Sequence, residues 1–217
     1  MKKRIASLVI ALVSLVAVIV CFGMVSSADD TATKTLPAGG GKVVDVWLVS
    51  GQSNAIGAAK VDNYPTDEAY AEYKTLLTNG SDNVWHIKNT DTAFVPAGFS
   101  QGSGTQSGPE IGITTALDGS ANMNAIIKVA YGNTSLYDNT SSNESIKYGT
   151  WTPPSYIDAH GISTQGNRTG DLYLTFIAKV AEGLEKLVAA GYTPNLKGVW
   201  FMQGEADTLV SSTDCKI

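Results

Sequence analysis

Cysteine and histidine are the scarcest residues that carry chemistry, with two of each in 217 residues. Cys21 lies in an apolar N-terminal run, so the rest of the chain holds only Cys215. A single thiol forms no intramolecular disulfide, and it supplies no cysteine cluster for a metal ion. The sequence therefore predicts a fold without disulfide bonds and without a metal site.

Basic residues are also too few to form a cationic surface. The chain has 15 Lys and Arg against 20 Asp and Glu, a net charge of -5. Three of the basic residues precede the apolar run, and their removal would make the charge more negative still. Nucleic acids and anionic lipids are bound mainly through Lys and Arg, so neither is an expected partner. A neutral sugar is compatible with this charge.

The N-terminal run is typical of a signal peptide. Apolar residues from Ile5 to Met24 follow a basic start, and small residues up to Ala28 precede acidic Asp29. This order predicts a signal peptide over residues 1–28 and a secreted or cell-surface protein. The run is also nearly long enough to span a bilayer, so a retained membrane anchor is the alternative. An uncleaved run is the only membrane contact that the sequence predicts.

The rest of the chain is long enough for one domain with a sizeable core. Residues 29–42 are polar and contain Gly39, Gly40 and Gly41 in a row, which predicts a flexible lead-in. The domain is expected over residues 43–217.

Short apolar runs alternate with helical periodicity along this domain. We expect strands over residues 43–49, 83–88, 125–130 and 198–202. We expect helices over residues 64–77, 109–117 and 172–190, and loops over residues 93–108 and 131–168. Strands that alternate with helices predict an α/β fold with a parallel sheet.

Polar motifs directly follow three of these strands. They are Gly51-Gln52-Ser53-Asn54, the stretch Tyr131–Ser135, and Gln203–Asp207. Because ligands bind beyond the carboxyl ends of parallel strands, we expect these loops to meet at one edge of the sheet. This convergence is the strongest argument from the residues alone for a functional site.

Ser53 has two interpretations. A serine that follows a buried strand and a glycine fits a nucleophile in a tight turn, although its hydroxyl is weak until a base takes its proton. The alternative is a helix cap. The spacing is not the G-x-S-x-G of α/β-hydrolases, because Ala55 occupies the last position.

The other polar candidates each have a structural alternative. The Gln203 amide is suited to an oxyanion hole or to a polar strand end. Glu205 and Asp207 are suited to paired acid–base catalysis, or to the start of the next helix. His86 falls in a strand and is expected to be structural. His160 follows Asp158 at two residues. However, a further helix and a further strand of the sheet come after it in the chain, so we do not expect it to be the base.

The motifs together resemble a known family. GQSN after a strand, Gly108-Pro109-Glu110-Ile111-Gly112, KVAYGNTSL, a Leu172-Tyr173 helix entry and Trp200–Asp207 occur in this order. The chain resembles SGNH hydrolases of the sialate O-acetylesterase-like and acetylxylan-esterase branch, carbohydrate esterase family 6, from about residue 43 to 207. The resemblance implies a flavodoxin-like three-layer α/β/α fold. It also implies hydrolysis of acetyl esters on carbohydrates, with an acetylated glycan as partner and no cofactor.

The resemblance also implies roles for individual residues. Ser53 would be the nucleophile, and its backbone N–H, the N–H of Gly108 and the Gln203 side chain would form the oxyanion hole. Supporting or substrate-binding roles would fall to Gln52, Asn54, Glu110, Asn133, Glu205 and Asp207. Asn133 is a departure, because the family commonly has Gly-Gly-Thr where this chain has Gly132-Asn133-Thr134.

The larger departure is the base, which the family carries in an Asp-x-x-His motif near its C-terminus. After Asp207 this sequence has Asp214 but no histidine. We interpret the sequence as C-terminally truncated, with an incomplete sheet, an unpaired strand edge, exposed apolar surface and little esterase activity. Two alternatives stay open: a noncatalytic carbohydrate-binding relative, and a membrane-anchored structural protein whose N-terminal run is not cleaved.

Overall fold

The computed structural model describes residues 34–60, 63, 68–98, 106–137, 147–164 and 168–209. The expected signal peptide, residues 1–28, lies outside these residues. The longest described helix has 19 residues, and five of them are charged. None of the described helices combines the length and the apolar character that crossing a membrane requires.

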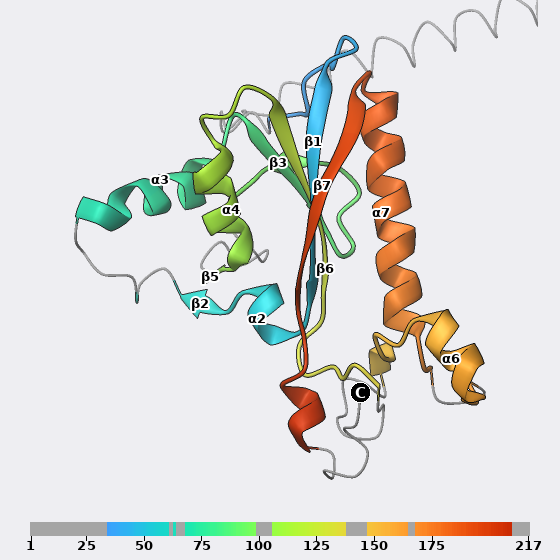
Figure 1. Cartoon of the computed structure of the whole chain (residues 1–217). Coiled ribbons are helices and arrows are strands. Elements are labelled where there is room, and N and C mark those ends of the chain that lie inside the picture. The colour runs from blue at the N-terminus through green and yellow to red at the C-terminus, as the bar shows by residue number, and fades with distance from the viewer. Residues whose placement is uncertain are drawn as a thin grey trace, which may run out of the picture. The chain divides into compact units, whose positions relative to one another are not determined.

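A mainly parallel sheet forms the centre of the domain (Figure 1). Its strand order is β4-β3-β6-β1-β7. The parallel strands are β3 (Val84–Lys88), β6 (Met123–Ala130), β1 (Val43–Gly51) and β7 (Thr193–Met202). The short edge strand β4 (Val95–Pro96) is antiparallel to β3.

Helices lie on both sides of this sheet, which confirms the expected layered α/β fold (Figure 1). One side carries α3 (Ala71–Asn79) and α4 (Pro109–Leu117), and the other carries α7 (Asp171–Ala189). The shorter elements are α2 (Ser53–Ile56), α6 (Pro154–His160), η2 (Glu68–Tyr70), η3 (Ala206–Leu209) and the antiparallel pair β2 (Ala59–Lys60) and β5 (Gln106–Ser107).

The apolar strands are buried because helices cover both of their faces. Toward α7, Val44, Val46 and Ile127 pack in one core cluster with Leu187. The second cluster contains Val49, Val84, Ala97 and Ile126, with Ile113 and Leu117 of α4 packed against it. Burial on both faces explains why β1 and β6 are continuous apolar runs rather than alternating ones.

Three sequence expectations need correction. The expected loop over residues 93–108 contains β4 and β5. The polar segment 131–168 contains α6, which starts with Pro154 in its first turn and ends at Gly161 in the left-handed conformation. Proline at the start and glycine at the end are the usual helix boundaries, and the polar composition between them concealed the helix. The helix expected over residues 64–77 begins only at Ala71, after η2, and residues 64–67 lie outside the described part.

The expected flexible lead-in is anchored where the structure describes it. Gly39 N–H donates to the Ala190 carbonyl at 2.7 Å, and Gly41 N–H donates to the Gly191 carbonyl at 2.7 Å. Leu36 packs against the main core cluster. From residue 34 onward the lead-in therefore belongs to the packed domain.

Strand β7 keeps apolar side chains exposed on both of its faces. Val199 and Phe201 point to one side and are 57% and 49% exposed, and Trp200 and Met202 alternate with them and are also exposed. Within the described residues β7 pairs only with β1. Exposed apolar side chains on an edge strand favour contact with a further strand or another chain.

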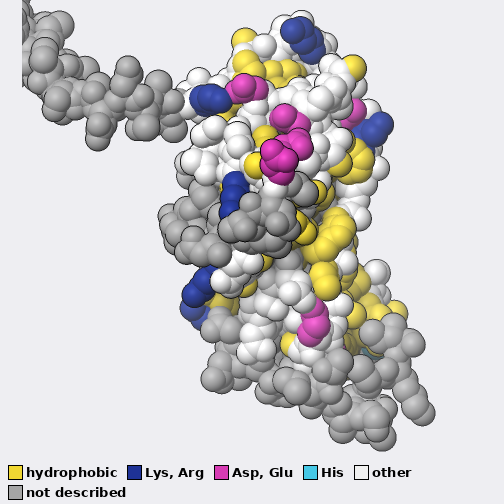
Figure 2. Space-filling model, turned by 90° about the vertical axis from the view of Figure 1, so that its left-hand side faces the viewer, with side chains coloured by type: hydrophobic (Ala, Val, Ile, Leu, Met, Phe, Trp, Pro, Cys, Tyr) yellow, Lys and Arg dark blue, Asp and Glu magenta, His cyan; other side chains and the backbone are white. Residues whose placement is uncertain are grey.

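Among the described residues of the face that carries α3 and α4, the basic side chains lie apart from one another (Figure 2). In the same view, the described acidic side chains include neighbouring ones near the upper middle, with uncharged side chains around them. The visible charge distribution of this face therefore agrees with the acidic composition of the chain.

Burial of His86 predicts loss of stability in acid. The side chain is 2% exposed in β3, and burial, with smaller contributions from Lys88 and Lys128, lowers its pKa well below 6.5. The unfolded chain therefore binds the proton more tightly, so stability that is complete above pH 6.5 is lost as the pH falls. We expect the free energy of unfolding to decrease by up to about 1 kcal/mol per pH unit below this value.

Urea unfolding between pH 7 and pH 5 measures this effect. His86→Leu should flatten the dependence, because it removes the buried titrating ring. His160→Leu is the matched control, since it removes the exposed histidine of α6 and should leave the dependence in place. If the free energy of unfolding changed equally with pH in His86→Leu and in the unsubstituted protein, His86 would not be the group responsible.

Candidate active site

The three polar motifs begin side by side at one edge of the sheet. Gly51 at the end of β1 is in register with Ala130 of β6 and with Met202 of β7. Tyr131 N–H donates to the Gly51 carbonyl at 3.1 Å, and Gln52 N–H donates to the Met202 carbonyl at 3.0 Å. The convergence expected from the sequence is therefore present in the fold.

Gly51 is required by the turn that follows β1. Its φ is +133°, and a Cβ built there would lie 1.9 Å from the Met202 carbonyl oxygen. Only glycine fits so close to a neighbouring strand in this backbone conformation. The chain thereby leaves the sheet at Gln52 and enters α2.

Ser53 is the first residue of α2 and is exposed, whereas Gln52 before it is buried. The N-cap position of α2 belongs to Gln52, so Ser53 is not the cap of this helix. The helix-cap interpretation of Ser53 is therefore wrong. An exposed serine at the carboxyl end of a central strand has the placement that a nucleophile needs.

The side-chain amides of Gln52 and Gln203 connect the three loops that follow β1, β6 and β7. The Gln52 Oε1 accepts from Ala206 N–H at 3.3 Å and from Gln203 Nε2 at 3.5 Å. Gln203 Nε2 also donates to the Thr134 carbonyl at 2.6 Å, and Gln203 Oε1 is buried without a partner in the described part of the chain. The Gln203 amide thus joins the loop after β6 to the loop after β7.

Glu205 and Asp207 are engaged by different partners. The buried Asp207 accepts from Leu136 N–H at 2.8 Å through both carboxylate oxygens, and from Tyr137 N–H at 3.3 Å. The exposed Glu205 accepts from Asn54 Nδ2 at 2.7 Å. Asp207 therefore shapes the loop after β6, while Glu205 contacts the residue next to Ser53.

Asn133 takes a backbone conformation that glycine favours. Its φ is +51°, in the left-handed region that asparagine tolerates better than most residues. Next to it, Thr134 is buried, and its Oγ1 accepts from Trp151 Nε1 at 3.0 Å. The change from glycine to asparagine is therefore compatible with the turn.

Gly108 lies against the end of the α2 segment. It is the N-cap of α4, and a Cβ on Gly57 would come within 2.2 Å of the Gly108 Cα. Glu110, in the first turn of α4, is fully buried and forms an ion pair with Lys128 at 2.7 Å. Lys128 was not among the residues predicted from the sequence, although a lysine within the apolar run of β6 was the available indication.

The histidines lie apart from this cluster. His160 Nδ1 bonds to the Tyr156 carbonyl at 2.9 Å within α6, and its ring stacks on Tyr156 at 3.9 Å between centroids. His86 is buried in β3. In the part of the chain that is described, no histidine ring forms a hydrogen bond with the Ser53 hydroxyl, and no group of three or more potential metal ligands occurs.

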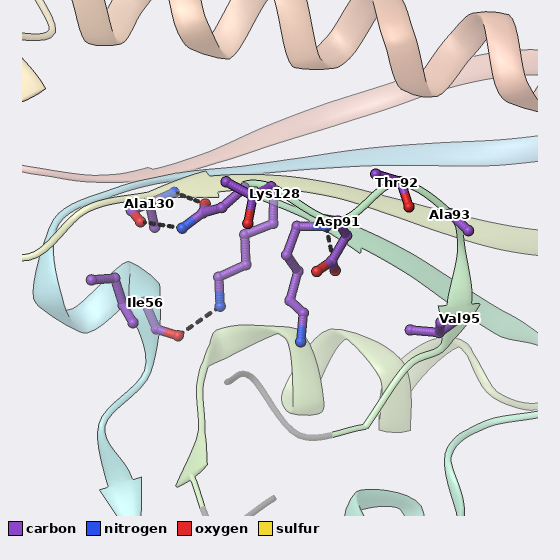
Figure 3. Close-up of a pocket in the computed structure, with 10 residues that line it drawn as sticks. Ile56, Asp91, Thr92, Ala93, Val95, Lys128 and Ala130 are labelled. Carbon is purple, nitrogen blue, oxygen red and sulfur yellow. Dashed lines mark hydrogen bonds between the residues drawn. The ribbon is translucent and has the colours of Figure 1, made fainter. Parts of the chain in front are cut away.

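A pocket of about 570 Å³ opens beside α2 at the ends of β3 and β6. Its lining includes Ile56, Lys88, Asn89, Asp91 and Lys128. Figure 3 shows the Lys128 side chain extending toward Ile56, whose carbonyl it contacts at 2.7 Å. Asn89 is committed to the scaffold, because its side chain bonds to both the N–H and the carbonyl of Ala130 at 2.9 Å.

Comparisons with known proteins identify relatives. A family model described as "carbohydrate esterase, sialic acid-specific acetylesterase" matches residues 43–215. Among solved structures, a protein from Arabidopsis thaliana is 16% identical, with a TM-score of 0.45 over 75% of this chain and 58% of that one. The structure of NanS is also 16% identical, with a TM-score of 0.47 over 79% of this chain and 57% of NanS. The chain thus spans less than two thirds of either structure, and no curated protein matches it.

Proposed function

Because the chain belongs to the sialic acid-specific acetylesterase family of carbohydrate esterases, we propose that it carries the nucleophile of a carbohydrate O-acetyl esterase. The observation that supports this most is the position of Ser53, exposed beyond Gly51 with the loops after β6 and β7 beside it. The proposed substrates are acetylated glycans such as xylan or sialic acid. The proposed location is the cell exterior or the cell surface.

In this proposal Ser53 Oγ attacks the acetyl carbonyl carbon while a base removes the hydroxyl proton. The sugar oxygen leaves with a proton, and water then releases acetate from the acetylated serine. The Ser53 and Gly108 N–H groups and the Gln203 amide would hold the negative oxygen of the tetrahedral intermediate. For Gln203, this requires Nε2 to exchange its bond to the Thr134 carbonyl for one to that oxygen. No step needs a cofactor.

We also propose that the base comes from an Asp-x-x-His segment outside these 217 residues. Neither histidine of the chain bonds to Ser53 in the described residues. Without its base, a serine nucleophile keeps only the contribution of the oxyanion hole and of substrate binding. We therefore expect the 217-residue chain to hydrolyse acetyl esters slowly at most.

The experiment is an acetate-release assay on two samples, the 217-residue chain and the longest polypeptide that the gene encodes. Acetylated xylan and O-acetylated sialic acid serve as substrates. Release by the longer polypeptide and little release by the 217-residue chain is the expected result. Binding of these glycans by the longer polypeptide without acetate release would instead indicate a noncatalytic carbohydrate-binding protein.

Gln203→Ala tests the oxyanion assignment. We expect kcat for acetyl-ester hydrolysis to fall roughly ten- to a thousand-fold, which is the range for the loss of one oxyanion donor. Thr152→Ala is a suitable control, because Thr152 also bonds to a carbonyl of the same loop, Leu136, at 2.8 Å but has no proposed contact with the intermediate. A change confined to KM would make Gln203 a substrate-binding residue.

A further inference from the structure

Lys128 lies at the centre of a buried contact between the nucleophile segment and the start of α4. Its side chain is 4% exposed, and that of its partner Glu110 is fully buried. Lys128 Nζ donates to the Ile56 carbonyl at 2.7 Å and to Glu110 Oε2 at 2.7 Å. One ammonium group thus joins β6, α2 and α4.

From this geometry we propose that Lys128 and Glu110 form a positioning pair that sets the nucleophile segment against Gly108. The proposal rests on the proposed function, since it concerns the alignment of Ser53 with an oxyanion donor. The bonds of this pair among the described residues go to Ile56 and to each other and not to Ser53, so both residues act through the backbone that they hold.

Lys128 and Glu110 hold the two backbone segments that the proposal concerns, the end of α2 and the start of α4. Ile56 is the last residue of α2, three residues after Ser53, and Gly57 follows it in contact with Gly108. A Cβ on Gly108 would lie 2.7 Å from Glu110 Oε2 and 2.9 Å from the Gly57 Cα. The carboxylate therefore packs directly on the Gly108 backbone, while the ammonium holds the carbonyl that ends α2.

Burial of two charged groups has a desolvation cost, so an ion pair is an unfavourable way to fill a core. Burial lowers the pKa of Lys128, which its neighbour Glu110 partly opposes, and Glu110 Oε1 has no partner among the described residues. Apolar residues of similar volume often replace a buried ion pair without loss of stability. A role in fixing geometry explains the pair better than a contribution to stability does.

Lys179 offers a matched comparison on the other side of the sheet. It is 6% exposed, and its Nζ also bonds to one carbonyl, that of Asp91 at 2.5 Å, and to one carboxylate, that of Glu182 at 3.1 Å. The carbonyl that it holds lies in the loop after β3 rather than in α2. Lys128 and Lys179 thus bond to the same kinds of group, although Glu182 is 42% exposed and Glu110 is fully buried. Of the two lysines, only Lys128 bonds to the nucleophile segment.

The test compares Lys128→Met/Glu110→Gln with Lys179→Met. The double variant removes both buried charges at nearly constant volume, so it is designed to fold even where a single substitution would not. Its thermal unfolding is recorded first, together with that of Lys179→Met. Hydrogen exchange is then measured in both variants at Ile56 and Gly57, whose N–H groups bond to the Gln52 carbonyl at 2.9 Å and the Ser53 carbonyl at 3.1 Å.

We expect these two amides to exchange at least about ten-fold faster in the double variant and at an unchanged rate in Lys179→Met. In the longest polypeptide that the gene encodes, kcat should fall roughly 10- to 100-fold in the double variant with KM nearly constant, as misplacement of a nucleophile predicts. Unchanged exchange at Ile56 and Gly57 in a folded double variant would overturn the positioning role. Full turnover of Ser53→Ala would overturn the proposed function. The exchange rates at Ile56 and Gly57 do not depend on that result, so they test the positioning role separately.

Discussion

Ser53→Ala is expected to lower kcat for acetyl-ester hydrolysis by roughly 10⁴- to 10⁶-fold, the loss seen when a serine hydrolase loses its nucleophile. The hydroxyl is exposed at the first position of α2, and alanine keeps the backbone of that helix while removing the attacking oxygen. The measurement is steady-state hydrolysis of a chromogenic acetyl ester by the longest polypeptide that the gene encodes.

Ser50→Ala is the matched control for this variant. Ser50 lies in the same strand end three residues earlier, and its buried Oγ has no hydrogen-bond partner in the described structure. Its replacement should change neither kcat nor KM appreciably. Turnover of Ser53→Ala close to that of Ser50→Ala would remove Ser53 from the nucleophile role.

Gly51→Ala is expected to reduce the free energy of unfolding by at least about 3 kcal/mol, near the upper end for a single substitution. The added methyl carbon would overlap the Met202 carbonyl oxygen, which lies 1.9 Å from the Cβ position. Relief of this overlap requires β7 to move away from β1 at the point where both enter the candidate site. Urea unfolding of the 217-residue chain measures the change.

The control for this substitution is Gly40→Ala. Gly40 also has a positive φ, +58°, but a Cβ there would meet nothing within 4 Å. It should therefore cost only the strain of a left-handed alanine, about 1–2 kcal/mol. If the two variants lost equal stability, the close approach of β1 and β7 at Gly51 would not be the constraint that the structure indicates.

Hydrophobic periodicity and composition were enough to predict the four parallel strands of the sheet. Continuous β-branched and apolar runs mark β1 and β6 because helices cover both of their faces, and Pro109 marks the start of α4. The short elements α6, β4 and β5 were not predicted. Each is too short for periodicity, and tertiary contacts decide their conformation.

The convergence of the three polar motifs could be predicted from the sequence, but the hydrogen bonds between them could not. Strand order alone brings the three motifs together, so Ser53 and Gln203 were found from the carboxyl ends of their strands. These hydrogen bonds were not predictable, because they join residues that are far apart in the sequence. Asp207 accepts from Leu136 N–H, and Lys128 donates to the Ile56 carbonyl. Lys128 was missed for this reason, as its role depends on α2 and α4 rather than on its own strand.

The most direct test of the account is to trap the acetylated enzyme. The longest polypeptide that the gene encodes is mixed with an activated acetyl ester, quenched in acid within the first turnover, digested and analysed by mass spectrometry. The account predicts one acetyl group on Ser53, present at early times and absent from Ser53→Ala. Acetate release in that first turnover with no acetyl group on Ser53, or with the group on another residue, would contradict it.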